Sequence, residues 1–194
     1  MKKIVLFLLL IVVISYDCSS QSLTKSQLRG EDSWVLSVGV NAIGSLGTRN
    51  PVKDLGDFQF KRPFALAIQH RWSRIFSIEQ DFTMNRFTEN TIIDGNPVPE
   101  DYNYYSTNTY LKYYISDDLF RTATWFDVFV GGGLGVFTID EFNTSANAVI
   151  GGTFWVNQDI GIRLQGVGKF AFNHKDNLFD NNHLQYMIQG VFRF

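Results

Sequence analysis

The feature that most constrains this chain is an alternation of apolar and polar residues, with a period of two, that recurs in eight segments. Successive side chains of a β-strand point to opposite faces, so this period is typical of strands with one apolar face. Each segment has about 9 to 15 residues, which is enough to cross a membrane at the usual strand tilt. The segments are Trp34–Ala42, Phe64–Trp72, Phe76–Asn85, Tyr104–Ile115, Trp125–Ile139, Ala148–Val156, Ile160–Phe172 and His183–Phe194.

The last segment carries the most specific signal. Its apolar residues are Leu184, Tyr186, Ile188, Phe192 and Phe194, and Gly190 is the one interruption. A terminal strand that ends in phenylalanine resembles the closing strand of Gram-negative outer-membrane β-barrels, which the barrel-assembly machinery reads during insertion. The resemblance implies an assembly signal made of Tyr186, Ile188, Phe192 and Phe194.

The apolar face of the segments could meet lipid, or it could fill the centre of a soluble, lipocalin-like barrel. The composition of the opposite, polar face decides between the two. That face is mostly Gly, Ser, Thr, Asn and Gln with a handful of charges, which fits a narrow polar lumen better than a water-exposed surface. Strands that cross hydrocarbon must close into a barrel to pair every backbone group. We therefore expect an all-β fold, an eight-stranded antiparallel up-and-down transmembrane β-barrel, over residues 34–194.

The connections between segments support this topology. When the segments are extended to the nearest turn residues, the connections cover about 2, 9 and 2 residues after the second, fourth and sixth segments, and about 17, 16, 6 and 10 residues after the others. Short periplasmic turns at one end and long extracellular loops at the other are typical of outer-membrane barrels. Aromatic residues near the segment ends are expected to form interfacial girdles, whereas the pattern puts Trp125 and Trp155 in the lumen. The girdle residues are Trp34, Trp72, Phe126, Phe172, Phe192 and Phe194.

The amino terminus has the layout of a secretory signal peptide. Lys2 and Lys3 precede an apolar run over residues 4–14, which is too short to span a bilayer, and a small polar stretch follows. We expect a signal peptide over residues 1–20 and a periplasmic lead-in over 21–33. Cys18 leaves a lipoprotein as the alternative, but the residues before it do not resemble a lipobox. Without Lys2, Lys3 and Asp17 the counts of 17 basic and 19 acidic residues become 15 and 18, about −3, so the sequence lacks the basic surface typical of nucleic-acid binding.

Seven charged residues fall on the polar face and are expected in the lumen. Their signs are mixed, and the interior of an eight-stranded barrel is just wide enough to be filled by side chains. The charges are therefore expected to pair into a plug, with a gated conduction path as the alternative. This lumen charge network consists of Arg71, Glu79, Asp81, Lys112, Asp127, Arg163 and Lys169.

Five glycines fall on the lipid-facing side of the last four segments. They relieve crowding in a strongly bent barrel, or they form a docking seam for another membrane protein or a lipid chain. We call them the glycine seam: Gly132, Gly152, Gly166, Gly168 and Gly190.

An enzymatic alternative rests on residues 172–177, which faintly resemble the His-x-Ser-Asn stretch of lipid A deacylases. Asp176 stands where the nucleophilic serine should be, and a carboxylate cannot be activated as a hydroxyl can. His70 and His183 lie on different segments with no metal-ligand spacing around them. We therefore expect no catalytic residues, no metal site and no cofactor.

From Trp34 to Phe194 the chain resembles the small outer-membrane barrels that include the OmpA transmembrane domain and OmpX. The resemblance implies a non-enzymatic barrel in the outer membrane with a structural or interaction role, and we consider an accessory subunit of an outer-membrane complex. The expected partners are outer-membrane lipid, the assembly machinery during insertion and another outer-membrane protein. A narrow channel or a surface ligand-binding barrel is the alternative. The acidic stretch over residues 94–101 is the loop segment considered for a surface ligand.

Overall fold

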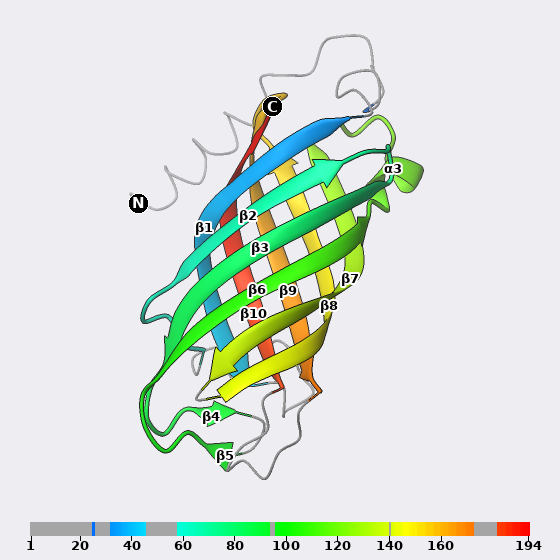
Figure 1. The fold of residues 1–194 in the computed structure, drawn as a ribbon. Coiled ribbons are helices and arrows are strands. Elements are labelled where there is room, and N and C mark those ends of the chain that lie inside the picture. The colour runs from blue at the N-terminus through cyan, green and yellow to red at the C-terminus, as the bar shows by residue number, and fades with distance from the viewer. Residues whose placement is uncertain (1–24, 26–31, 46–57, 94–95, 140, 173–181) are drawn as a thin grey trace, which may run out of the picture.

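The computed structural model describes residues 25, 32–45, 58–93, 96–139, 141–172 and 182–194, and these form a closed barrel (Figure 1). Around the barrel the strand order is β1-β10-β9-β8-β7-β6-β3-β2, and all pairings are antiparallel. The predicted eight-stranded up-and-down barrel is therefore confirmed. Its strands are β1 (Ser33–Ser45), β2 (Phe64–Arg71), β3 (Phe76–Phe87), β6 (Tyr102–Tyr113), β7 (Phe126–Ile139), β8 (Glu141–Trp155), β9 (Ile160–Ala171) and β10 (His183–Arg193).

The first and last strands close the barrel. They pair from Val35 opposite Arg193 to Ser45 opposite His183. The N–H of Trp34 donates to the carbonyl of Phe194 (3.1 Å), and the N–H of Phe194 donates to the carbonyl of Trp34 (3.0 Å). Closure gives each of the eight barrel strands a neighbour on both sides, which is what a β-structure needs in hydrocarbon.

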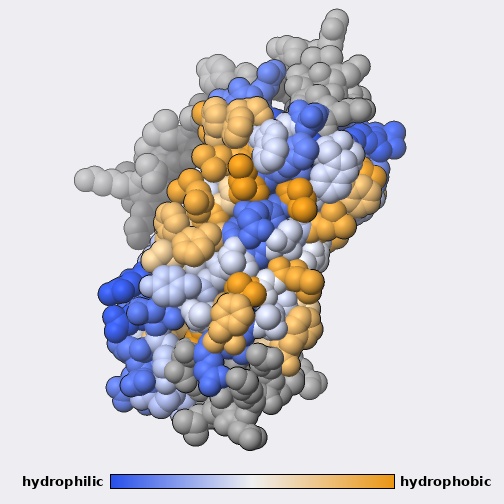
Figure 2. Space-filling model, in the orientation of Figure 1, coloured by the Kyte–Doolittle hydropathy of each residue, from blue (hydrophilic) through white to orange (hydrophobic). Residues whose placement is uncertain are grey.

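The two faces of every strand separate as the alternation predicts. Apolar residues such as Leu36, Ile78 and Leu164 are exposed on the outside, and polar residues alternate with them on the inside. Figure 2 shows hydrophobic side chains over much of the middle of one face of the outer surface, with hydrophilic ones among them, and we call this zone the outer belt. The part of the chain that the structure describes contains no helix long and apolar enough to cross a membrane.

Most of the expected girdle residues lie on the outside at the strand ends: Trp34, Trp72, Phe172, Phe192 and Phe194 are exposed, and Phe126 is half-buried. The expectation for Trp125 was wrong. It precedes β7, is 59% exposed and stacks against the outward rings of Phe126 and Phe154. Trp155 does turn inward and is half-buried.

The two ends of the barrel differ (Figure 1). Tight turns and the one-turn helix α3 (Ser116–Leu119) lie at the end where the barrel closes with Phe194. Local side-chain caps close two of the turns: Ser73 Oγ accepts from the N–H of Phe76 (2.9 Å), and Asn157 Oδ1 accepts from the N–H of Ile160 (2.7 Å). The small hairpin of β4 (Ile92–Ile93) and β5 (Asn96–Pro97) lies at the opposite, loop end.

The prediction of a long loop between the fifth and sixth segments was wrong. Strand β7 ends at Ile139 and β8 begins at Glu141, so a single residue connects them where about six were expected. Residues 141–147 continue the ladder with β7, from Glu141 opposite Ile139 onward. Their Asn and Ser side chains face inward and hydrogen-bond there, for example Ser145 Oγ to Asn147 Oδ1 (2.8 Å). Residues 141–147 have a polar composition typical of a loop. The buried polar partners of their side chains therefore stabilise them as part of a strand.

Candidate functional site

The centre of the lumen is occupied by three charged residues, which we call the central ion cluster: Glu79 on β3, Lys112 on β6 and Arg163 on β9. The Lys112 ammonium lies 2.6 Å from Glu79 Oε1, and Arg163 Nη1 donates to Glu79 Oε2 at 2.6 Å. None of the three side chains is more than 1% exposed. Three strands separate β3 from β9 on either side, so the Arg163–Glu79 pair spans the full lumen.

Neutral groups complete the coordination of the two cations. Lys112 donates to Gln165 Oε1 (2.8 Å), and Arg163 donates to Gln69 Oε1 (2.9 Å). The ring of Phe129 lies between them, 4.3 Å from the Lys112 ammonium and 5.6 Å from the Arg163 guanidinium. Such contacts offset part of the cost of removing the charges from water.

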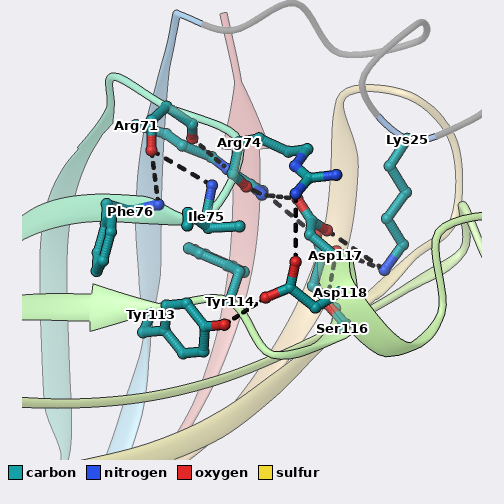
Figure 3. Close-up of polar contacts among 12 residues, drawn as sticks. Lys25, Arg71, Arg74, Ile75, Phe76, Tyr113, Tyr114, Ser116, Asp117 and Asp118 are labelled. Atoms are coloured by element: carbon teal, nitrogen blue, oxygen red, sulfur yellow. Dashed lines mark hydrogen bonds and ion pairs between the residues drawn. The ribbon is translucent and has the colours of Figure 1, made fainter.

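A second group of charges fills the turn end, and we call it the turn-end cluster: Lys25, Arg71, Asp117 and Asp127. Arg71 forms an ion pair with Asp117 of α3 (Figure 3), and the Lys25 ammonium lies 3.1 Å from Asp127 and 3.6 Å from Asp117. The indole N–H of Trp155 also donates to Asp127 (2.7 Å). The two cations thus neutralise two buried carboxylates at the mouth of the barrel.

Exposed contacts hold α3 over this mouth. Arg74 lies 3.2 Å from Asp118, and the Tyr113 hydroxyl donates to the same carboxylate (Figure 3). Below them, the Arg71 guanidinium stacks 4.0 Å from the Tyr114 ring, whose hydroxyl accepts from the Gln69 amide (2.6 Å). Gln69 therefore joins the turn-end cluster to the central ion cluster.

The loop-side third of the lumen combines a polar tier with an apolar one. Asn108 donates to Asp81 (2.6 Å), and Lys169 donates to Asn108 (3.1 Å) and to Ser106. Beyond this tier lies a cluster of buried apolar side chains, which we call the apolar cap: Ile43, Phe87, Val98, Tyr104, Phe137, Ile139 and Ala171.

All seven residues of the predicted lumen charge network lie inside the barrel, and the structure distributes them over these three tiers. Asp117 and Lys25 were not predicted to lie in the lumen. Asp117 lies in a connection without periodicity, and Lys25 lies in the lead-in, so neither position carried a signal of burial. Among the described residues, no group of three or more His, Cys, Asp or Glu side chains is placed to hold a metal ion.

The outer surface of β7 to β10 carries a shallow groove of about 510 Å³. Gly152 and Gly166 form part of its floor, and its apolar walls include Phe126, Leu164 and Ile188. Neighbouring rings already occupy the space above the two glycines. An added Cβ would lie 3.3 Å from the Phe126 ring at Gly152 and 3.3 Å from the Tyr186 ring at Gly166.

The other three members of the glycine seam are different. At Gly132, Gly168 and Gly190 an added Cβ would meet no atom nearer than 3.6 Å. Local crowding therefore does not require glycine at these three positions. They leave the outer surface of β7, β9 and β10 flat.

The four residues of the predicted assembly signal share the outer face of β10. Ile188, Phe192 and Phe194 are exposed, and Tyr186 is half-buried beside Gly166. Residues 173–177 of the deacylase-like stretch lie outside the described part of the chain. Of the acidic loop stretch, residues 96–101 are described: Asn96–Pro97 form β5, Val98 is buried in the apolar cap, and Asp101 pairs with Arg86 at 2.9 Å.

No family model matches the chain, and no curated protein matches it in sequence. Among solved structures, the N-terminal barrel of OprF from Pseudomonas aeruginosa has a TM-score of 0.57 at 10% identity, covering 86% of this chain and 100% of that one. OprG from the same organism has a TM-score of 0.55 at 11% identity, with coverages of 86% and 98%.

Neisserial surface protein A (NspA) has a TM-score of 0.52 at 14% identity, covering 84% of this chain and 96% of that one. At such identities the likeness concerns the fold, which these three proteins share over nearly their whole length. The apolar outer belt and the closed ladder agree with it. The chain has the fold of the small eight-stranded outer-membrane β-barrels.

Proposed function

We propose that this protein is a non-enzymatic outer-membrane barrel that acts through its outer surface, as an accessory subunit of an outer-membrane complex. The observation that carries the proposal is the contrast between its two sides. The lumen is filled by ion pairs and the apolar cap. The glycine seam on β7 to β10, by contrast, is flat at Gly132, Gly168 and Gly190, where local packing does not require glycine.

The proposed occupant of the seam is another outer-membrane protein. Glycine inside a strand often marks a place where a second backbone approaches closely, and small residues have the same use where membrane segments meet. Gly168 and Gly190 face outward on the neighbouring strands β9 and β10, and each lies two residues from a residue that lines the groove, Gly166 and Ile188. A partner strand that packs there would bury apolar surface without displacing any side chain.

Purification of the tagged protein from native membranes tests this proposal. Gly168→Leu is the informative variant, because the site has room for a side chain and the barrel is expected to fold. Leu66→Phe adds bulk to the lipid face of β2, away from the seam, and serves as the matched control. Loss of a co-purifying protein in Gly168→Leu alone supports the seam. Retention of every partner by a folded Gly168→Leu variant contradicts it.

The proposal also implies that the lumen does not conduct. Arg163 and Glu79 bridge opposite walls, and the apolar cap covers the polar tiers. In planar bilayers the purified barrel should therefore show no large, steady conductance. A stable open level in the unmodified protein would favour the channel alternative.

A further inference from the structure

The outer belt has a polar interruption on β3 and β6 that the proposed function does not use. Gln80, Thr107 and Thr109 all face outward, and Gln80 and Thr109 are exposed. Figure 2, which views this side of the barrel, shows hydrophilic residues within the belt. We call these three residues the polar patch.

The polar patch lies at the middle of the membrane. Gln80 is the third of the five outward residues of β3 from Phe76 to Met84, and the other four, Phe76, Ile78, Phe82 and Met84, are aromatic or apolar. Thr109 is opposite Gln80 in the ladder and is the third of the five outward residues of β6 from Tyr105 to Tyr113. Four residues of a tilted strand rise about 10 Å, so both side chains lie about 10 Å from either edge of the belt.

The hydrogen bonds within the patch do not use the whole capacity of Gln80. The Thr109 hydroxyl donates to Gln80 Oε1 (2.5 Å), and Gln80 Nε2 donates to Thr107 Oγ1 (2.7 Å). The other N–H of this amide has the Asp81 carbonyl at 3.4 Å, the long limit of a hydrogen bond. An amide oxygen accepts two hydrogen bonds, so Gln80 presents one weakly held donor and one open acceptor position.

Hydrocarbon offers no water to complete these bonds, and polar side chains at this depth are rare and usually functional. The group that best completes the Gln80 amide is another primary amide, because two amides exchange one N–H···O bond in each direction. In a side-by-side pair with a two-fold axis along the membrane normal, every residue keeps its depth, and a residue that lies on the axis meets its own copy. The polar patch is therefore complementary to itself.

We propose that two copies of this barrel associate in the membrane through β3 and β6, with the Gln80 amides of both copies hydrogen-bonded across the two-fold axis. Ile78, Phe82 and Leu111 surround the patch and are exposed, so they pack against the same residues of the second copy. This surface is separate from the glycine seam on β7 to β10. The dimer does not depend on the partner proposed for the seam.

Cysteine crosslinking tests the proposal directly. Cys18 is the single cysteine of the chain, so the unmodified protein reports the background. Gln80→Cys places a thiol on the proposed axis. Ile188→Cys places one at the centre of the outer face of β10, which is four strands from β6 around the ring. Each variant is reconstituted alone into phosphatidylethanolamine–phosphatidylglycerol vesicles and treated with a membrane-permeant oxidant.

We expect Gln80→Cys to give a disulfide-linked dimer at least about ten times more abundant than Ile188→Cys does. Equal yields, or none above background from Gln80→Cys, would overturn the proposal. Energy transfer between labelled barrels gives a second measurement, in which Gln80→Leu should weaken self-association at least about five-fold. Leucine suits a lipid-facing site, so the variant is expected to fold, and unchanged association of the folded variant would also overturn the proposal.

Discussion

Removing the charge of Glu79 should destabilise the barrel strongly. In Glu79→Gln the two cations of the central ion cluster keep their places, but the carboxylate that neutralises both is lost. At about 4 Å and an effective dielectric constant near 20, each lost attraction is about 4 kcal/mol. Relaxation and the remaining amide contacts offset part of this. We therefore expect the free energy of unfolding to fall by about 3–5 kcal/mol, the usual cost of breaking a buried ion pair.

Equilibrium unfolding in urea measures this change, with the barrel in lipid vesicles and tryptophan fluorescence as the signal. Asp101→Asn is the matched control, because it removes the carboxylate of the exposed Arg86–Asp101 pair (2.9 Å) and should cost less than about 1 kcal/mol. A double variant gives a second measurement. Glu79→Gln combined with Lys112→Met removes one of the unpaired cations and should recover part of the loss.

A loss below about 1 kcal/mol in Glu79→Gln would refute the reasoning. It would mean that water reaches Lys112 and Arg163 and screens them as it does at the surface. The same result would weaken the proposal of a filled, non-conducting lumen, because both depend on a dry central tier.

Three further predictions use other parts of the barrel. Gly133→Ala should lower the free energy of unfolding by about 1–3 kcal/mol, because the added Cβ would lie 2.0 Å from the Thr109 carbonyl oxygen. Gly132→Ala is the control and should change it by less than about 1 kcal/mol. Equal effects of the two variants in urea titrations would contradict this. Phe194→Ala keeps both backbone hydrogen bonds between Trp34 and residue 194, so the variant should refold normally in vesicles. In cells, fractionation should show less of it in the outer membrane. A normal amount there would show that the Phe194 ring is not part of the assembly signal. Lys25→Ala should cost about 1–3 kcal/mol, measured by heat-dependent gel mobility, because two buried carboxylates lose a partner; unchanged mobility would show that the lead-in does not stabilise the mouth.

The period-two pattern was sufficient to predict the fold because every strand has one face in lipid and one in the lumen. A register slip by one residue would invert both faces, so the pattern specifies the pairing strongly. Where the outer face is weakly apolar, the prediction failed. The connection after Ile139 was expected to cover about six residues, but the chain there continues as β8, whose outward residues include the weakly apolar Thr144 and Ala146.

The lumen charges could be placed inside from the sequence, but their partners could not. Glu79 and Arg163 are 84 residues apart along the chain, and their contact depends on which strands face each other across the closed ring. The polar patch was missed for a different reason. Gln80 breaks the apolar series of β3, and its depth becomes visible only when the register with Thr109 is known.

The reciprocal bonds between Trp34 and Phe194 hold the start of β1 beside the end of β10, at the same end of the barrel as the tight turns. A short linker between these neighbouring ends, with a cut in the turn at Asn157, would give a circularly permuted chain with the same strand neighbours throughout. In that chain β10 becomes an internal strand while its place in the wall is unchanged. The permuted chain thus separates two contributions of β10: its pairing with β9 and β1 in the barrel, and its position at the carboxy terminus of the polypeptide.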